Sequence, residues 1–265
     1  MKKVGFIGAG NMGGALASAA AKTENTEIYL TDKDELKAEA LAEKIGATAT
    51  SDEKIAKVCD IIFLGVKPNI VEAALEPIAD IIAKREDVTL VSMAAGVSIE
   101  KIEKCVSSPT PVIRIMPNTP VAVGEGMILY SRGSAVTDGQ VSDFLSVMSK
   151  AGRLDLIDER LIDAGSALSG CGPAFVYMFI EALADGAVEC GLPRDKAMLY
   201  AASTLAGAAK MVLESGTHPG ALKDAVCSPG GSTIEGVHAL EDGAFRGTVI
   251  DAVSAAYEKT KKLGK

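Results

Sequence analysis

Gly8-Ala9-Gly10-Asn11-Met12-Gly13-Gly14 follows the apolar run from Val4 to Ile7 and opens a stretch with helix-like spacing of apolar residues. This is a G-x-G-x-x-G pattern between a strand and a helix. Its first glycine permits a tight turn, its second lets the backbone approach a pyrophosphate, and its third lets the helix pack on the strand. Free N–H groups at the helix start attract the anion. The residues predicted to bind a dinucleotide here are Gly8, Gly10, Asn11, Met12 and Gly13.

Outward from this segment, β-branched runs alternate with helix-like stretches, as in a parallel sheet with crossover helices. The predicted strands are Lys3 to Ile7, Glu27 to Leu30, Asp60 to Leu64, Val88 to Ser92, Val112 to Ile115 and Met127 to Tyr130. The predicted helices are Met12 to Lys22, Asp34 to Lys44, Ile70 to Ala83 and Gln140 to Ser149. We therefore predict an α/β Rossmann-like domain over residues 1–160.

Alanine, leucine and methionine dominate the chain after about Asp163, which predicts an all-helical domain over residues 161–265. Pro173 suits a first helical turn, and Gly191 with Pro193 signals a helix end. The stretch from Ala174 to Ile180 is apolar on every face of a helix, so it must be buried on all sides. A subunit interface provides that burial, and the central helix of a monomeric bundle is the alternative.

Composition excludes several classes of protein. The net charge is −8 and the 27 Lys and Arg residues are scattered, so nucleic acid is not an expected partner. Two histidines and five separated cysteines predict neither a metal site nor a disulfide framework, and the cysteines are interpreted as buried thiols. The N-terminal apolar run is too short for a signal peptide, and we expect no run near the ~20 residues of a membrane span. A cytoplasmic protein without membrane contact is expected.

The residues that contact the adenine ribose should follow the second strand, at Thr31-Asp32-Lys33. Asp32 can accept hydrogen bonds from ribose hydroxyls and repel a 2′-phosphate, which favours NAD. Thr31 and Lys33 can instead bind that phosphate, which favours NADP. Alternatively, Asp32 only caps the following helix. The sequence leaves both cofactors open.

Two further loops follow strands where an open parallel sheet binds ligands. They are Gly65-Val66-Lys67-Pro68 and Ser92-Met93-Ala94-Ala95-Gly96, whose small residues leave room for a cofactor. Lys67 pairs with a phosphate or is an ordinary solvated lysine. The cofactor residues predicted in these loops are Val66, Lys67, Pro68, Ala94, Ala95 and Gly96.

Near the C-terminal end, Ser228-Pro229-Gly230-Gly231-Ser232-Thr233-Ile234-Glu235 combines an open turn with a helix start. Ser232 and Glu235 have the spacing of a capping box. The Pro-Gly-Gly stretch leaves backbone N–H groups unobstructed, which suits a bound carboxylate. A plain helix start without a ligand has the same pattern, so this segment alone does not decide.

Motifs occur in order at G-F-I-G-A-G-N-M-G 5–13, V-K-P 66–68, M-A-A-G-V 93–97, R-I-M-P-N-T-P 114–120, L-S-G-C-G-P-A 168–174, A-D-G 184–186, G-L-P 191–193 and S-P-G-G-S-T-I 228–234. In these motifs the chain resembles the pyrroline-5-carboxylate reductases. The resemblance spans almost the whole sequence, and the M-P-N-T-P and S-P-G-G-S-T-I motifs are more specific than the glycine loop.

This resemblance implies a Rossmann-like domain, a helical dimerisation domain and a homo-oligomer that uses NADPH or NADH, with NADPH favoured. It implies hydride transfer from the nicotinamide C4 to C5 of 1-pyrroline-5-carboxylate, giving L-proline in the last step of proline biosynthesis. Asn118 would lie near the nicotinamide, and Thr233 would hydrogen-bond the ring nitrogen as the catalytic residue. The residues implied to bind the substrate are Ser228, Gly230, Gly231, Ser232 and Thr233.

Two positions depart from the family pattern. Cys171 stands where serine is common, and Asp32 stands where NADPH-preferring members often carry a small hydroxyl residue. A β-hydroxyacid dehydrogenase begins with a similar glycine motif, but such enzymes use a helical lysine that the stretch from Ala164 to Phe175 lacks. A nucleotide-sensing protein without catalysis is the other alternative.

Overall fold

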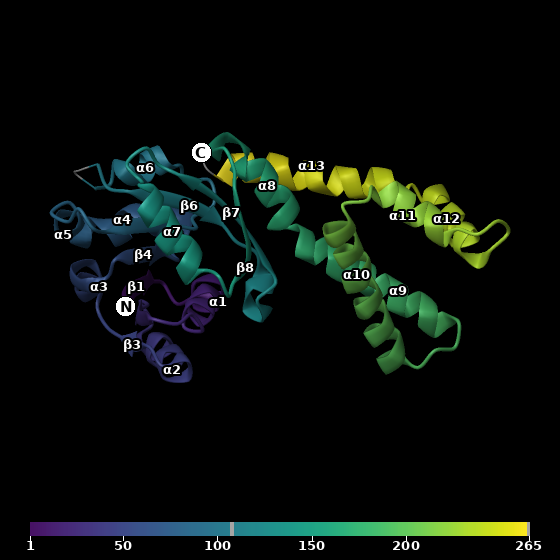
Figure 1. Ribbon diagram of the computed structural model, residues 1–265, viewed down its shortest axis with the longest axis horizontal. Helices are drawn as coiled ribbons and strands as arrows, with labels where there is room; N and C mark the ends of the chain where they lie inside the picture. Colours follow the sequence, from purple (N-terminus) through teal and green to yellow (C-terminus); the bar gives the residue numbers. More distant parts are fainter. Residues whose placement is uncertain (107–108, 264–265) are drawn as a thin grey trace. The chain divides into compact units, whose positions relative to one another are not determined.

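The computed structural model describes residues 1–106 and 109–263. They form two compact units, one made of Met1–Cys171 with the C-terminal segment from Ala256, the other of Gly172–Ala255 (Figure 1). The first unit contains the β-sheet and the second is helical, so the predicted fold class is confirmed. The domain division at residue 160 stays a prediction.

One sheet contains the strands of the first unit, in the order β3-β2-β1-β4-β5-β6-β7-β8. The strands are β1 (Lys2–Ile7), β2 (Thr26–Thr31), β3 (Thr48–Ala49), β4 (Ile61–Leu64), β5 (Thr89–Ser92), β6 (Val112–Met116), β7 (Gly126–Arg132) and β8 (Gly152–Leu156). Neighbouring strands are parallel except β6 and β7. Ile7 pairs with both Thr31 and Leu64, so the loops after β1, β2 and β4 lie at one edge of the sheet.

Helices cover both faces of this sheet. They are α1 (Asn11–Ala20), α2 (Glu35–Ile45), α3 (Asp52–Val58), α4 (Val71–Leu75), α5 (Ala79–Ile82), α6 (Ile99–Glu103), α7 (Asp138–Val147) and α8 (Ile162–Ser169). Successive residues of β4 contribute to opposite cores: Phe63 joins the cluster that contains α1 and α7, and Leu64 joins the one with α3 to α6. Because both faces of the central strands are buried, their sequences are continuous runs of apolar residues.

The structure departs from the sequence prediction in four elements and in one broken helix. The unpredicted elements are β3, β8, α3 and α6. The helix predicted over residues 70–83 is divided into the 3-10 turn η1 (Pro68–Ile70), α4, the 3-10 turn η2 (Glu76–Ile78) and α5. The interruption at η2 contains Pro77, which has no N–H to donate and therefore breaks a continuous helix.

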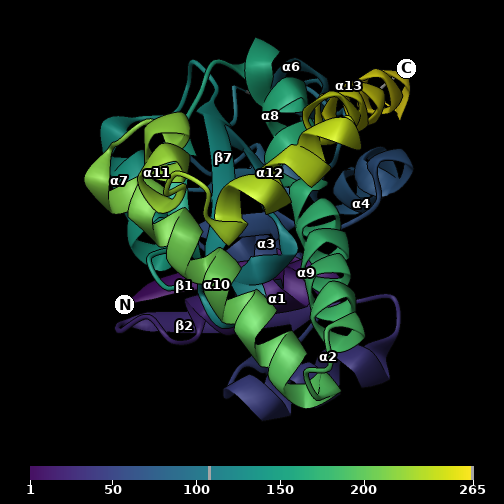
Figure 2. The same cartoon turned by 90° about the vertical axis from the view of Figure 1, so that its right-hand side faces the viewer.

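The second unit contains α9 (Gly172–Glu189), α10 (Arg194–Ser215), α11 (Pro219–Val226), α12 (Ser232–Asp242) and most of α13 (Phe245–Leu263). α9 and α10 pack against each other (Figure 2). Their buried residues are small, namely Ala184, Ala197 and Ala201. Small side chains let two helices approach closely, but they bury little apolar area within the chain.

Large apolar side chains of this unit are therefore exposed in a single chain. On α9, Tyr177 is 58% and Met178 is 70% exposed. The stretch Glu159–Glu189 is also long and apolar enough, by length and composition, to cross a membrane. The expectation from the sequence rests on unbroken apolar runs, whereas this stretch qualifies by its average hydropathy, a test that core helices also pass. Contiguous exposed apolar surface of this kind marks an interaction site.

The cysteines also differ from expectation. Cys59 is buried, and this burial raises the pKa of its thiol to about 12. Cys105, Cys171 and Cys227 are partly buried, while Cys190 is exposed just after α9. The interpretation of all five as buried thiols is wrong for four of them. Cys171, Cys190 and Cys227 belong to, or adjoin, the helical unit with its open surface, and Cys105 follows the short helix α6.

Candidate active site

The glycine loop between β1 and α1 has the geometry that its sequence predicts. Gly8 has a φ of +103°, and a Cβ added there would lie 2.7 Å from the Gly65 carbonyl oxygen. A Cβ on Gly13 would overlap the Gly8 carbonyl oxygen. A Cβ on Gly10 would meet no protein atom within 4 Å. Gly8 and Gly13 are thus required by close backbone packing, whereas Gly10 borders open space.

That open space faces the start of α1. Gly10 is the N-cap of the helix, and no side chain caps it. Asn11 is exposed and Met12 is partly buried in the first turn. Because first-turn N–H groups have no partner within their own helix, they are available to an anion. The residues present therefore fit a dinucleotide pyrophosphate.

Asp32 connects the end of β2 to the glycine loop. Its carboxylate accepts hydrogen bonds from the N–H groups of Ala9, at 2.8 Å, and Asp34, at 3.1 Å. Asp34 is the residue that caps α2, through the N–H of Lys37. The alternative in which Asp32 caps the helix is therefore wrong. Asp32 holds the glycine loop in place and stands where a ribose is expected.

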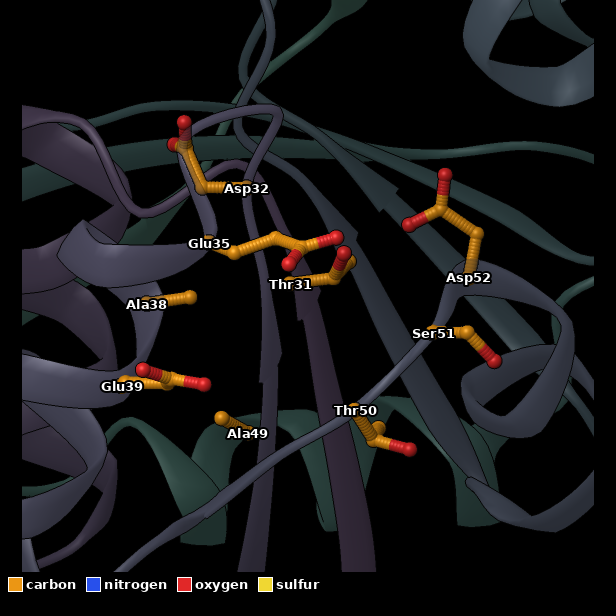
Figure 3. A pocket seen from close by; sticks show the side chains of 9 residues that line it. All are labelled: Thr31, Asp32, Glu35, Ala38, Glu39, Ala49, Thr50, Ser51 and Asp52. Carbon is orange, nitrogen blue, oxygen red and sulfur yellow. The ribbon is translucent and has the colours of Figure 1, made fainter.

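A pocket of about 390 Å³ lies beside the end of β2 (Figure 3). Thr31 and Asp32 border it on one side. Its other lining residues are Glu35, Ala38 and Glu39 of α2, with Ala49, Thr50, Ser51 and Asp52 around the start of α3. Lys33 is exposed and does not line it. The pocket therefore contains several carboxylates and hydroxyls.

The two remaining predicted cofactor loops extend the same edge. The Gly65 N–H bonds the Ile7 carbonyl at 2.8 Å, which brings the Val66-Lys67-Pro68 segment beside the glycine loop. Lys67 is exposed. In the loop after β5, Ala94 is 1% exposed and its N–H bonds the Ser92 hydroxyl.

Because the Ala94 side chain faces the core, only its backbone can meet a ligand. Ala95 and Gly96 are partly buried, and Gly96 has a φ of +73°. Direct contact of these loops with a cofactor stays a prediction.

Asn118 has a structural role that sequence reasoning missed. It is 8% exposed, its amide nitrogen donates to the Ser169 carbonyl, and its amide oxygen accepts from the Met127 N–H, both at 2.9 Å. The side chain therefore connects the loop after β6 to β7 and to the end of α8. Proximity to the nicotinamide stays a prediction, and the second amide hydrogen remains available for it.

Arg114, on β6, holds the other end of α8 and was not singled out from the sequence. Its side chain is 5% exposed and pairs with Asp163 at 2.8 Å and Glu159 at 3.3 Å. Glu159 also accepts the Ile99 N–H at 2.8 Å. A buried arginine beside carboxylates distant in sequence leaves no local pattern, so only the fold reveals this network.

The predicted substrate loop lies wholly in the helical unit. Gly230 has a φ of +68°, and the Gly231 N–H closes a turn on the Ser228 carbonyl at 3.0 Å. Gly231, not Ser232, is the N-cap of α12, and no side chain bonds its first turn. The predicted capping box of Ser232 and Glu235 is therefore wrong, because the N-cap lies one residue before Ser232.

Because the helix is capped at Gly231 and not at Ser232, no side chain bonds the N–H groups of its first turn. Ser232 becomes the first helical residue, and Thr233 follows it in the first turn, with both side chains exposed. Since no hydroxyl occupies the first N–H groups, a substrate carboxylate can accept from them. Thr233 lies in that same first turn, and a contact of its hydroxyl with the substrate stays a prediction.

Comparison with known proteins shows the family to which the chain belongs. Residues 159–263 match the family model described as pyrroline-5-carboxylate reductase dimerisation, and residues 3–96 match NADP oxidoreductase coenzyme F420-dependent. The pyrroline-5-carboxylate reductase of Escherichia coli is 43% identical over 100% of this chain and 99% of its own length. The chain belongs to the pyrroline-5-carboxylate reductase family. The Arabidopsis thaliana reductase is 40% identical, over 98% of this chain and 95% of its own.

Solved reductase structures share both sequence and fold with the chain. The Plasmodium falciparum pyrroline carboxylate reductase, which has NADP bound, is 36% identical with a TM-score of 0.85, covering 100% of this chain and 98% of its own. The Coxiella burnetii pyrroline-5-carboxylate reductase is 32% identical with a TM-score of 0.89, covering 99% and 98%. The Rossmann-like domain and the helical dimerisation domain predicted from the sequence are thus confirmed for this chain.

The rival β-hydroxyacid dehydrogenase shares only the fold. The 3-hydroxyisobutyrate dehydrogenase of Mycobacterium tuberculosis is 12% identical, with a TM-score of 0.55 over 73% of this chain and 67% of its own. Family membership makes the chain an NAD(P)H-dependent oxidoreductase that acts on a C=N group, in proline biosynthesis.

Proposed function

We propose that this chain reduces 1-pyrroline-5-carboxylate to L-proline with NADPH or NADH in the cytoplasm, with the substrate loop at Ser228–Thr233 and the cofactor at the glycine loop. The observation that carries the proposal is the 43% sequence identity to the Escherichia coli pyrroline-5-carboxylate reductase, which covers 100% of this chain and 99% of that reductase. The open first turns of α1 and α12 support it, because one suits a pyrophosphate and the other a carboxylate.

Cofactor binding is assigned to the first unit. Backbone N–H groups after Gly10 hold the pyrophosphate, and Asp32 accepts from the ribose while it fixes Ala9. When bound, NAD(P)H supplies the hydride that the imine carbon receives. The other residues assigned to this site are Gly8, Asn11, Met12, Gly13, Thr31, Lys33, Val66, Lys67, Pro68, Ala94, Ala95, Gly96 and Asn118.

Substrate binding is assigned to the turn before α12. The backbone N–H groups of this loop, from Ser228 to Ser232, hold the carboxylate. The Thr233 hydroxyl hydrogen-bonds the ring nitrogen. As hydride transfer neutralises the protonated imine and leaves a lone pair on that nitrogen, the hydroxyl donates to the lone pair. A protonated imine is already electrophilic, so these residues act by positioning and need no strong acid.

Turnover tests the proposed function. Purified protein is expected to oxidise reduced nicotinamide only when pyrroline-5-carboxylate is added, and to form proline in equal amount. The assay follows absorbance with NADPH and NADH in parallel and measures proline separately. Cofactor binding without turnover of either cofactor would favour the nucleotide-sensing alternative and contradict this proposal.

The protein is expected to be at least a dimer through its helical unit, because α9 exposes large apolar side chains in one chain. Met178→Lys places a charge on that surface and should shift the sedimenting species toward monomer. Leu36→Lys is the matched control, since Leu36 is 76% exposed on α2 of the other unit. An active wild-type monomer in sedimentation, or an equal effect of both substitutions, would contradict the assignment.

A further inference from the structure

We propose that the pocket beside β2 makes NADH the preferred cofactor, with Glu35, Glu39 and Asp52 as its specificity-determining residues. The inference rests on the proposed function, because it concerns the dinucleotide assigned to the glycine loop. It concerns one part of that ligand, the 2′-position of the adenine ribose, which carries a hydroxyl in NADH and a phosphate in NADPH. The NADP-bound relative shows only that another member accepts the phosphate.

The position of the pocket follows from the sheet. In Rossmann folds an acidic residue after the second strand accepts a hydrogen bond from the ribose 2′-hydroxyl. Asp32 occupies that place, and its bond to the Ala9 N–H at 2.8 Å ties it to the loop assigned to the pyrophosphate. The pocket begins at Thr31 and Asp32. Its cavity of about 390 Å³ therefore adjoins the place where the 2′-substituent must lie.

The chemistry of the lining decides between hydroxyl and phosphate. Glu35 and Glu39 lie on one wall, Asp52 lies on the opposite wall, and Thr31 stands between them (Figure 3). Among the described residues that line the pocket, none is a lysine, arginine or histidine. A phosphate monoester carries a charge of about −1.5 to −2 at pH 7, so it meets like charges here without a compensating cation. A hydroxyl can instead donate to a carboxylate.

Lys33 is the residue that opposes this inference. It follows Asp32 directly and is exposed, so its ammonium can approach a phosphate from outside the pocket. If that contact dominated, Lys33→Gln would weaken NADPH binding and leave NADH binding unchanged. Lys33 keeps the place in the cofactor site assigned above, but the carboxylates outnumber this single solvated lysine. We therefore expect Lys33→Gln to weaken NADPH binding by less than threefold.

The test is direct binding of NADH and NADPH to the full-length protein without substrate, followed by fluorescence of the reduced nicotinamide. At low salt, wild type should bind NADH roughly tenfold more tightly than NADPH. The Glu35→Gln, Glu39→Gln double substitution should strengthen NADPH binding about tenfold and change NADH binding less than twofold. Glu43→Gln is the control, because Glu43 lies on α2 but does not line the pocket. Raising the salt concentration should reduce the ratio of NADH affinity to NADPH affinity in wild type, because these carboxylates are partly or fully exposed and salt screens their charges.

The binding experiment separates failure of this inference from failure of the proposed function. Tighter wild-type binding of NADPH, or an equal response of both cofactors to the double substitution, would overturn the inference. Binding of neither cofactor would instead contradict the proposed function. Asp32→Ser is a poor test, because it also removes the bond to Ala9 and should weaken both cofactors even where it relieves repulsion.

Discussion

Thr233→Ala is expected to lower kcat by roughly ten- to a hundredfold, which corresponds to ~1.4–2.7 kcal/mol of lost transition-state stabilisation. The reason is that the hydroxyl contact with the ring nitrogen should strengthen as the imine becomes an amine. Thr233 is exposed in the first turn of α12, and Gly231 is the N-cap. Loss of an exposed hydroxyl away from the cap usually costs little stability.

The measurement compares kcat, KM and melting temperature on the same Thr233→Ala sample. Thr233→Ser is the control that keeps the hydroxyl, and it should retain most of the turnover. A rise in KM alone would mean that the hydroxyl binds substrate and transition state equally. An unchanged kcat with a slightly altered melting temperature would remove Thr233 from the mechanism.

Gly10→Ala is expected to weaken binding of both NADH and NADPH by more than about tenfold while leaving the fold intact. An added Cβ would meet no protein atom within 4 Å, and the backbone of Gly10 has a φ of −63° that alanine adopts freely. The methyl group would instead occupy the space through which the pyrophosphate approaches the backbone. Fluorescence titration measures the affinity for each cofactor, and thermal unfolding measures whether the fold is intact.

Gly13→Ala is the matched substitution with the opposite result. Its Cβ would overlap the Gly8 carbonyl oxygen, which is backbone and cannot rotate away. Overpacking of this kind typically costs about 1–3 kcal/mol, so the melting temperature should fall. If Gly10→Ala lowered the melting temperature as much, or left cofactor affinity unchanged, the glycine loop would not be the pyrophosphate site.

The parts of the structure that sequence predicted are those set by local chemistry. The glycine loop was predictable because Gly8 and Gly13 are required by nearby backbone atoms, the Gly65 and Gly8 carbonyl oxygens, while Gly10 borders open space. The central strands were predictable because burial on both faces makes continuous apolar runs. By contrast, β3 has two residues, and β8 is largely exposed with the mixed sequence G-R-L-D-L, so neither carries a strong strand pattern.

The parts that sequence missed depend on long-range contacts or on the choice between neighbouring caps. Arg114 pairs with Asp163, and Asn118 bonds Ser169, so both ends of α8 are held by residues about 50 positions earlier. Ser232 matched a capping box, yet Gly231 takes the cap because it follows the turn closed on Ser228. Asp32 was considered as the cap of α2 for the same reason, since the actual cap, Asp34, is an equally good capping residue only two positions later.

The most direct test of the central claim is the fate of the transferred hydrogen. Pyrroline-5-carboxylate is incubated with the protein and with reduced cofactor that carries deuterium at both C4 positions, and the proline is analysed by mass spectrometry and NMR. Hydride transfer from nicotinamide C4 predicts proline with one deuterium, located at C5. Proline without deuterium, deuterium at another carbon, or no proline at all would contradict the account.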